Sequence, residues 1–282
     1  MAVVMDIRPS PIAGRWYESN PNRLARQIDT YLEKAQIPPI SGDVIGLVAP
    51  HAGHRYSGFT AAHAFKTVMG RSYDLVVVVS PYHDIFPGNL ITTAHQAYST
   101  PLGDIPVDTV ALTSLEKDIQ SVCGQPIRRI SRDTEHSLEI ELPFLQRSLV
   151  GSFSLLPVMV RSRNAQEMQA LGEGIAVIAS KQSTLLVASS DLSHFYPESQ
   201  AEILDAFLEK QILELSPKGV LDADITGKGY ACGAGAISAI LWASLKLKAN
   251  KAVLLHHSTS ADETGDHQSV VGYGAAAILK TG

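Results

Sequence analysis

Histidine side chains in this chain repeatedly follow short apolar segments. His51, His83 and His194 each come shortly after a run of apolar residues, and the histidine pair at 256–257 follows another such run. Imidazole nitrogens bind transition metals and transfer protons near neutral pH. A single histidine beside an apolar run is usually a hydrogen-bonded structural residue, but the same arrangement at several runs is not expected by chance. We therefore predict that these side chains form one metal-binding or catalytic site.

The apolar segments before these histidines are typical of buried strands. Their apolar residues run continuously instead of alternating with polar ones, which indicates burial on both faces of a sheet. In open α/β sheets, ligands bind beyond the carboxyl ends of the strands, and the histidines are predicted to lie there. The predicted strands cover residues 44–49, 75–79, 155–160, 185–188, 252–255 and 270–279.

Helical patterns separate the predicted strands. Asn20 followed by Pro21 indicates a helix cap and a first-turn proline, and amphipathic spacing continues beyond them. The alternation of strands and helices predicts an α/β fold: one domain over residues 1–282, with a central, mainly parallel or mixed sheet and helices on both faces. Residues 95–106 have a hairpin-like pattern and are predicted to add antiparallel strands. The predicted helices cover residues 21–32, 57–69, 108–122, 164–179, 199–215 and 233–247.

Cys232 offers a sulfur ligand to the same site. It lies in a Gly- and Ala-rich segment immediately before the last predicted helix. A helix N-terminus lowers the pKa of a thiol, which favours a thiolate and hence metal binding or nucleophilic reactivity. The alternative is a small residue buried in close packing. Together with the histidines, we expect His51, His83 and Cys232 to hold one transition-metal ion.

Two further segments carry groups that can move protons. Asp191 precedes His194 by three residues, and a carboxylate at that spacing can fix the tautomer of an imidazole that acts as a base. Thr134 is a possible cap for a helix from Glu135 to Phe144. On a helix, Glu135 and His136 would point in different directions, so they cannot both bind one ion. We expect His136 to act beside the pocket as a hydrogen-bond donor or acid–base group.

The remaining histidines and Cys123 carry weaker signals. His54, His256 and His257 suit either a supporting role beside the site or the surface. His63 lies in a helical pattern and is expected to pack, and Cys123 ends a predicted helix and is expected to be structural.

Composition excludes several classes of function. The net charge of −5 and the absence of a Lys/Arg run argue against nucleic acid as a partner. Two cysteines are too few for a secreted disulfide scaffold. The first residues lack the basic and apolar regions of a signal peptide, and no apolar stretch is long enough to span a bilayer. We expect a cytoplasmic location without membrane contact.

Many short fragments of this chain together resemble the Memo family, whose prokaryotic members are called AmmeMemoRadiSam system protein B. The likeness runs through nearly the whole chain. The fragments include Ala13–Tyr17, Pro50–Gly53 with Tyr56 and Gly58, Pro81 with His83, Glu135–Ser137, Ser189–Asp191 with His194, and Cys232–Gly233.

The resemblance implies a fold similar to the class III extradiol ring-cleaving dioxygenases. It places His51 and His83 at the positions of the two iron-binding histidines of those enzymes and His194 at their acid–base histidine. Cys232 falls where they have a glutamate ligand. A thiolate in place of a carboxylate shifts the preference from Fe(II) toward copper or zinc. Fe(II) or copper is therefore the expected cofactor, with zinc as an alternative.

The resemblance also implies a pocket beside the metal. Asp191 belongs to it, and Trp16 forms an aromatic wall. Tyr17 and Tyr56, which lie in matching fragments, are expected to contact the substrate.

Three functions fit these residues. The first is a metal-dependent redox enzyme of dioxygenase type, in which His194 transfers a proton. The second is a non-catalytic accessory protein that binds a peptide or small molecule and works with a radical S-adenosylmethionine protein and an AMMECR-like protein. The third is a hydrolase, either metal-assisted or with a serine or thiol nucleophile. It is less favoured because Gly-x-Ser-x-Gly is absent and Asp191 lies too near His194 in sequence for the usual triad.

Overall fold

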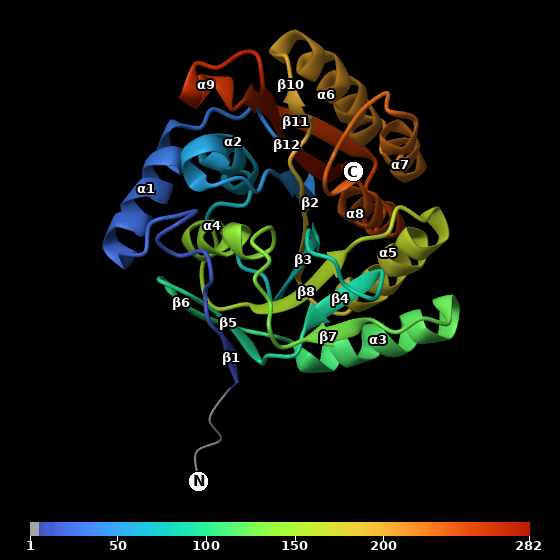
Figure 1. The fold of residues 1–282 in the computed structure, drawn as a ribbon. Helices are drawn as coiled ribbons and strands as arrows, with labels where there is room; N and C mark the ends of the chain where they lie inside the picture. Colours follow the sequence, from blue (N-terminus) through green and yellow to red (C-terminus); the bar gives the residue numbers. More distant parts are fainter. Residues whose placement is uncertain (1–5) are drawn as a thin grey trace.

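A mixed sheet of nine strands forms the centre of the computed structural model, which describes residues 6–282 (Figure 1). Strand β11 (Lys251–Thr259) pairs only with β12 at one side of this sheet. The other strands follow in the spatial order β10 (His194–Tyr196), β12 (Val270–Lys280), β2 (Asp43–Ala49), β9 (Thr184–Ser189), β3 (Leu75–Pro81), β8 (Ser154–Val160), β4 (Leu90–Thr93) and β7 (Arg128–Ile130).

Four neighbouring strands in the middle of the sheet, β2, β9, β3 and β8, are parallel. The strands that flank them, β12 and β4, are antiparallel to β2 and β8. Every residue of β3 is buried, as expected for a strand covered on both faces. Because the four strands are parallel, their carboxyl ends meet at one edge of the sheet. The predicted α/β fold with a mixed sheet is confirmed.

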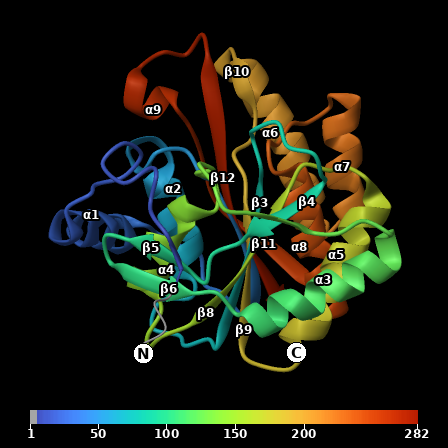
Figure 2. The same ribbon diagram turned by 60° about the horizontal axis from the view of Figure 1, so that its bottom comes forward.

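Helices cover both faces of the sheet (Figures 1 and 2). Helix α2 (His54–Lys66) packs on β2 and β12, and α1 (Pro21–Lys34) and α4 (Leu142–Ser148) pack on α2. On the other face, α8 (Ala234–Lys246) packs on β3 and β9, followed by α5 (Ala165–Ala179) and α3 (Thr109–Cys123). The remaining helices are α6 (Glu198–Leu213), α7 (Pro217–Thr226), α9 (Ala261–Thr264) and the short 3₁₀ helix η1 (Glu139–Glu141).

The helix caps explain why the predicted helix boundaries are nearly right. The side chains of Asn20, Asp108 and Asn164 accept hydrogen bonds from backbone N–H groups at the starts of α1, α3 and α5. Such side chains satisfy donors that the helix itself leaves without partners. Helix α7 was not predicted, because its ten residues show little contrast between an apolar and a polar face.

The predicted hairpin at 95–106 exists, but it belongs to a second, smaller sheet. Strands β5 (Ala97–Thr100) and β6 (Gly103–Pro106) are antiparallel, and β1 (Ile7–Arg8) pairs with β5. This three-stranded sheet lies beside α4 in Figure 1. It brings the N-terminal segment next to the loop that precedes η1.

Two predicted elements are wrong in their bounds. Strand β11 continues to Thr259, so His256 and His257 lie inside a strand and not beyond its end. The segment from Glu135 opens as a loop, and helical structure begins only at Glu139. The reason is local: the Glu135 carboxylate accepts the backbone N–H groups of His136 and Ser137, a side-chain alternative to helical hydrogen bonding.

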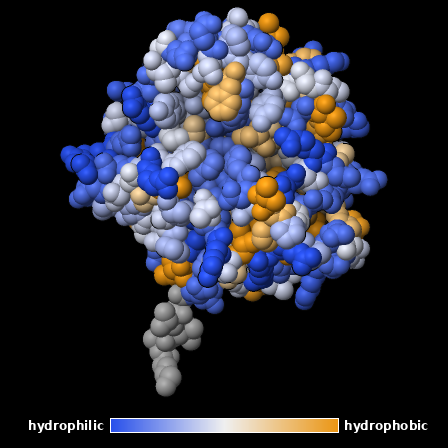
Figure 3. Space-filling model, in the orientation of Figure 1, coloured by the Kyte–Doolittle hydropathy of each residue, from blue (hydrophilic) through white to orange (hydrophobic). Residues whose placement is uncertain are grey.

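The surface view in Figure 3 shows mostly polar side chains with apolar ones scattered among them. Within residues 6–282, no helix combines the length and apolar character that crossing a membrane requires. Ile85 and Phe195 are among the most exposed large apolar side chains, at 97% and 73%. Each lies one or two residues from a histidine of the predicted site.

Candidate metal centre

Three imidazoles converge at the carboxyl edge of the parallel strands. His51 follows β2, His83 follows β3, and His136 comes from the loop before η1. One ligand atom from each ring lies within 4.8 Å of the corresponding atoms of the other two. The His51 ring is almost perpendicular to the other two rings, whereas the rings of His83 and His136 are stacked with centroids 4.9 Å apart. Ligands that share one ion have this kind of spacing.

Hydrogen bonds fix the tautomer of His51. Ser189 Oγ lies 2.6 Å from both the Ser137 carbonyl and Glu141 Oε1. Since its hydrogen goes to one of these acceptors, Ser189 Oγ accepts from His51 Nδ1, 3.0 Å away. Nε2 therefore carries the lone pair, and its neighbour is Cys232 Sγ, 3.1 Å away. Burial, followed by the charges of His136 and His83, lowers the pKa of His51, so the ring is neutral at pH 7 and competent as a ligand.

Glu135 orients the other two imidazoles. Its carboxylate lies 3.0 Å from His83 Nδ1 and 3.1 Å from His136 Nδ1, and it accepts the backbone N–H of His83 at 2.6 Å. Burial raises the pKa of Glu135, but the hydrogen bond and charge of His83 outweigh burial and leave that pKa below its ordinary value. A carboxylate behind Nδ1 leaves Nε2 as the basic atom, a common arrangement behind metal-binding histidines.

His136 therefore occupies a different place from the one that helical geometry predicted. Because it lies in a loop, its ring can turn toward His51 and His83 while Glu135 stands behind it. Burial lowers the pKa of His136 to about 4. The side chain belongs to the histidine cluster itself, and not only to its surroundings.

Cys232 lies next to this cluster, in the segment between α7 and α8. Its Sγ is 3.1 Å from His51 Nε2 and 3.5 Å from the Asp191 carbonyl oxygen. Gly233 is required behind it, because a Cβ there would lie 2.5 Å from the Ser189 carbonyl oxygen. The expected effect of the helix N-terminus on the thiol is wrong: burial and then the charge of Asp191 raise the pKa of Cys232. Without a cation beside it, the thiol stays protonated.

Asp191 does not orient His194, contrary to the sequence prediction. Its carboxylate accepts the backbone N–H groups of His51 and Ala52 at 2.7 and 3.2 Å, so it holds the loop that carries His51. Burial raises the pKa of Asp191 to about 7. His194 Nδ1 instead lies 2.8 Å from the Leu192 carbonyl oxygen and donates to it. The local chain, which enters β10 and is not helical, separates the two side chains.

His194 keeps the properties that a proton-transfer group needs. With Nδ1 donating to a carbonyl oxygen, its Nε2 can accept a proton. Burial lowers the pKa of His194. Its ring centroid lies 5.4 Å from that of Tyr230, a residue that lines the pocket described below.

The three aromatic residues expected in the pocket have different environments. Trp16 stacks on the His136 ring with centroids 3.9 Å apart, so it does form a wall of the cluster. Tyr17 is only 4% exposed and donates its hydroxyl hydrogen to Glu139, which places it in the packing behind the site. Tyr56 is 43% exposed on the first turn of α2. Among residues 6–282, no hydrogen bond or ring contact joins Tyr56 to the histidine cluster.

Arg8 is a supporting residue that the sequence did not reveal. It is 1% exposed and pairs with Asp133 at 2.6 Å and with Glu139. It also donates to the Glu135 carbonyl oxygen at 2.8 Å. A buried guanidinium with these partners fixes the loop that carries Glu135 and His136. No local pattern signals this role, because it depends on the pairing of β1 with β5.

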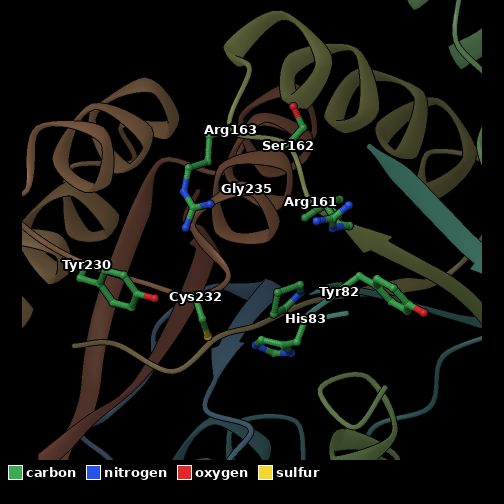
Figure 4. Close-up of a pocket in the computed structure, with 10 residues that line it drawn as sticks. Tyr82, His83, Arg161, Ser162, Arg163, Tyr230, Cys232 and Gly235 are labelled. Atoms are coloured by element: carbon green, nitrogen blue, oxygen red, sulfur yellow. The ribbon is translucent and has the colours of Figure 1, made fainter. Parts of the chain in front are cut away.

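A pocket opens beside His83 and Cys232 (Figure 4). Its far wall comes from the segment after β8, which contributes Arg161 and Arg163, and from Tyr230. The sequence signal for these arginines was available, because they follow a predicted buried strand as His51 and His83 do. They were not predicted, because arginine does not bind transition metals as histidine and cysteine do. The other lining residues are Pro81, Tyr82, Val160, Ser162 and Gly235.

The histidines of β11 lie away from this centre. His256 stacks on His63 with ring centroids 4.1 Å apart, and His257 Nε2 lies 2.9 Å from Asp205 on α6. Neighbouring residues of a strand point to opposite faces, so His256 faces α2 and His257 faces α6. His54, which was expected either beside the site or at the surface, is buried. Its Nε2 lies 3.1 Å from the Ile140 carbonyl oxygen.

The fold and the site together define an α/β protein with a histidine-rich candidate metal centre at the carboxyl edge of its sheet. The Memo-like protein family matches residues 8–277. Similar proteins include a MEMO1 family protein of Nitrosopumilus maritimus, 32% identical with 97% of this chain and 100% of the relative covered. Another is a MEMO1 family protein of Methanosarcina barkeri, 33% identical with 96% and 100% covered. The chain belongs to the Memo-like family, as the resemblance predicted.

Among solved structures, the chain is similar to an uncharacterized protein of Escherichia coli. The two share 12% sequence identity and a TM-score of 0.45, and the match covers 83% of this chain and 99% of the other.

Proposed function

We propose that this protein is a metal-dependent redox protein of the extradiol dioxygenase type. In this proposal, His51 and His83 hold one transition-metal ion, and Cys232 supplies the third ligand. The observation that carries the proposal is the convergence of imidazoles whose Nδ1 atoms are each occupied by a protein partner. With Nδ1 occupied, Nε2 is the nitrogen that each ring would offer to the ion.

The donor set fits a transition metal better than a hard cation. Imidazole and thiol donors suit copper, zinc and iron, whereas Mg²⁺ and Ca²⁺ require oxygen ligands. The Cys232 thiol, buried and protonated on its own, would lose its proton on binding because a nearby cation reverses the effect of burial. The exposed side of the cluster also supports the proposal, because the His83 side chain is 38% exposed. An accessible ligand leaves room for a substrate.

Fe(II) or copper fits the redox proposal, and zinc would fit a non-redox use of the same ligands. A redox-active ion at this position would supply the electron transfer that oxygenation of a small molecule requires. The chain's own residues supply the rest. Trp16 walls the cluster behind His136, and the neutral His194 can remove a proton from a substrate hydroxyl through Nε2.

Metal analysis of protein prepared without chelators or a histidine tag tests the ligand assignment. Wild-type protein is expected to bind close to one equivalent of metal, and His83→Ala to lose most of it. His63→Ala is the matched control, because it removes a histidine that stacks on another ring but lies away from the centre. Equal metal content in all three proteins would contradict the proposal.

The identity of the third ligand needs a separate pair of variants. Cys232→Ala should abolish the sulfur-to-metal charge-transfer absorption of the copper-loaded protein, whereas His136→Ala should preserve that band. Absence of the band in the wild-type protein, with metal lost in His136→Ala and kept in Cys232→Ala, would instead assign the third position to His136, which belongs to the same cluster. Oxygen uptake by Fe(II)-loaded protein on a panel of catechols then tests turnover. Metal binding without uptake across the panel would favour an accessory role with other proteins.

A further inference from the structure

The pocket in Figure 4 has an unusual charge for this chain. The protein carries a net charge of −5, yet the pocket is lined by two arginines and by no aspartate or glutamate among the described residues. Arg161 and Arg163 lie on its wall opposite Cys232 and His83 (Figure 4). A positive patch beside a proposed reaction centre indicates how a ligand would be oriented there.

The Arg161 guanidinium is held by a backbone carbonyl oxygen. Its Nη1 donates to the Phe86 carbonyl oxygen at 2.5 Å, which fixes the side chain. Within residues 6–282, no aspartate or glutamate oxygen forms an ion pair with it. A guanidinium has five N–H donors, so the single bond to Phe86 leaves most of them for a ligand.

Arg163 is held in place by a different contact. Its Nε pairs with Asp224 of α7. Asp224 is almost buried, with only 5% of its side chain exposed, whereas the Arg163 side chain is 43% exposed. Figure 4 shows the guanidinium pointing into the space above Cys232, with the Tyr230 hydroxyl directed to the same space from the side. The pair with Asp224 therefore orients Arg163 and partly offsets its charge.

The start of helix α8 adds to the positive character of the pocket. Gly235 lines the pocket, and the first turn of α8 has no acidic residue and no side-chain cap. The N-terminus of a helix carries a partial positive charge. A Cβ at Gly235 would lie 2.4 Å from the Ser162 carbonyl oxygen, so glycine permits this helix end to approach the arginine segment.

We propose that the ligand of this pocket is a small molecule with a carboxylate or phosphate group, and that Arg161, with Arg163 and Tyr230, binds this anionic group. Planar guanidinium groups match the geometry of both anions. The rest of the molecule would then extend toward His83 and Cys232. This inference rests on the proposed function for what happens at the metal centre, but the binding of an anion can be measured on its own.

Isothermal titration of the full-length protein with benzoate, phenyl phosphate and neutral benzamide tests the inference. We expect the two anions to bind and benzamide not to bind detectably. Arg161→Gln should weaken anion binding by about tenfold or more, because charged hydrogen bonds are lost. Arg147→Gln is the control, because Arg147 is an arginine that lies outside the pocket, where it pairs with Asp29. The ratio of benzoate to phenyl phosphate affinity identifies which anion the pocket prefers.

Equal affinity for benzoate and benzamide, or equal anion affinity in Arg161→Gln and Arg147→Gln, would overturn the inference. His51→Ala separates it from the proposed function, because His51 is buried and does not line the pocket. That variant should lose metal and keep benzoate binding. Arg161→Gln should keep its metal and bind benzoate about tenfold or more weakly than wild type, with an unchanged thermal midpoint showing that it is folded.

Discussion

The molecule contains two groups of histidines that lie at the ends or edges of the same sheet. The first is the cluster of His51, His83 and His136. The second is the stacked pair of His63 on α2 and His256 on β11. In both groups the Nδ1 atoms have protein partners, but those partners differ. Glu135 stands behind two rings of the cluster, whereas the pair uses the Phe59 carbonyl and the Thr60 hydroxyl.

The orientation of the rings differs as well. In the cluster, the His51 ring is nearly perpendicular to the other two rings, which are stacked on each other. In the pair, the rings are almost parallel, at 17°. The cluster also depends on buried charges that the pair lacks, since Arg8, Asp133 and Glu139 hold its loop. The groups that accept hydrogen bonds from Nδ1 therefore distinguish the candidate metal centre from the stacked pair more than the number of histidines does.

The largest expected effect comes from removing the buried charge that supports the cluster. Arg8→Met should lower the free energy of unfolding by roughly 3–5 kcal/mol, because Asp133 and Glu139 would keep buried charges without a cation. Arg147→Met, which breaks an exposed pair with Asp29, should cost about 1 kcal/mol or less. Urea unfolding followed by circular dichroism measures both. Similar losses in the two variants would show that the Arg8 network is not specially important.

Next in size is the effect of the carboxylate behind the rings. Glu135→Gln should weaken metal affinity by about 10- to 100-fold, because the imidazoles lose a charged acceptor that orients them and raises their basicity. Thr60→Val makes the corresponding change in the stacked pair and should leave metal affinity unchanged. Competition with a chromogenic chelator measures the affinities. If Thr60→Val weakened binding as much as Glu135→Gln, the two groups would not differ as we infer.

A smaller effect is expected on the stability of the stacked pair. Thr60 Oγ1 lies 3.0 Å from His256 Nδ1 and 2.6 Å from Ser258 Oγ. Thr60→Val removes the hydroxyl and should reduce the free energy of unfolding by about 1–3 kcal/mol, since both partners lose a hydrogen bond. Chemical denaturation at neutral pH checks this value. No change would mean that water replaces the hydroxyl.

The smallest expected effect is a pH dependence that belongs to the stacked pair. Burial, followed by the charges of His63 and His257, lowers the pKa of His256 to about 4. In the unfolded chain a histidine has a pKa of about 6.5, so between these values the unfolded state binds a proton that the native state does not. Stability therefore falls as pH decreases through this window. His256→Gln should lose less stability than wild type between about pH 7 and pH 5, as measured by thermal unfolding.

Much of the fold was predictable because the signals were local. Continuous apolar runs predicted β2, β3, β8 and β9, and the predicted cap Asn20 with Pro21 placed the start of α1 correctly. The errors arose where local patterns compete with contacts from elsewhere. Strand β11 continues through two histidines because β12 pairs with it along its whole length. The predicted helix at Glu135 does not form, because the Glu135 carboxylate accepts hydrogen bonds from the next two backbone N–H groups.

The candidate site was predictable in its residue types but not in their partners. The rule that polar side chains follow parallel strands found His51 and His83, and the same rule would have found Arg161. It gave no access to hydrogen bonds between distant segments. Asp191 was assigned to its sequence neighbour His194, yet it binds the backbone of His51, 140 residues away.

The sequence by itself determined the α/β class, the family and the segments that end at the rim of the sheet, because apolar periodicity and residue order are written along the chain. Only the tertiary structure decided which groups stand behind each imidazole, that His136 joins the cluster, and that burial keeps the Cys232 thiol protonated. Those properties depend on desolvation and on distances between segments far apart in sequence, which no local pattern encodes.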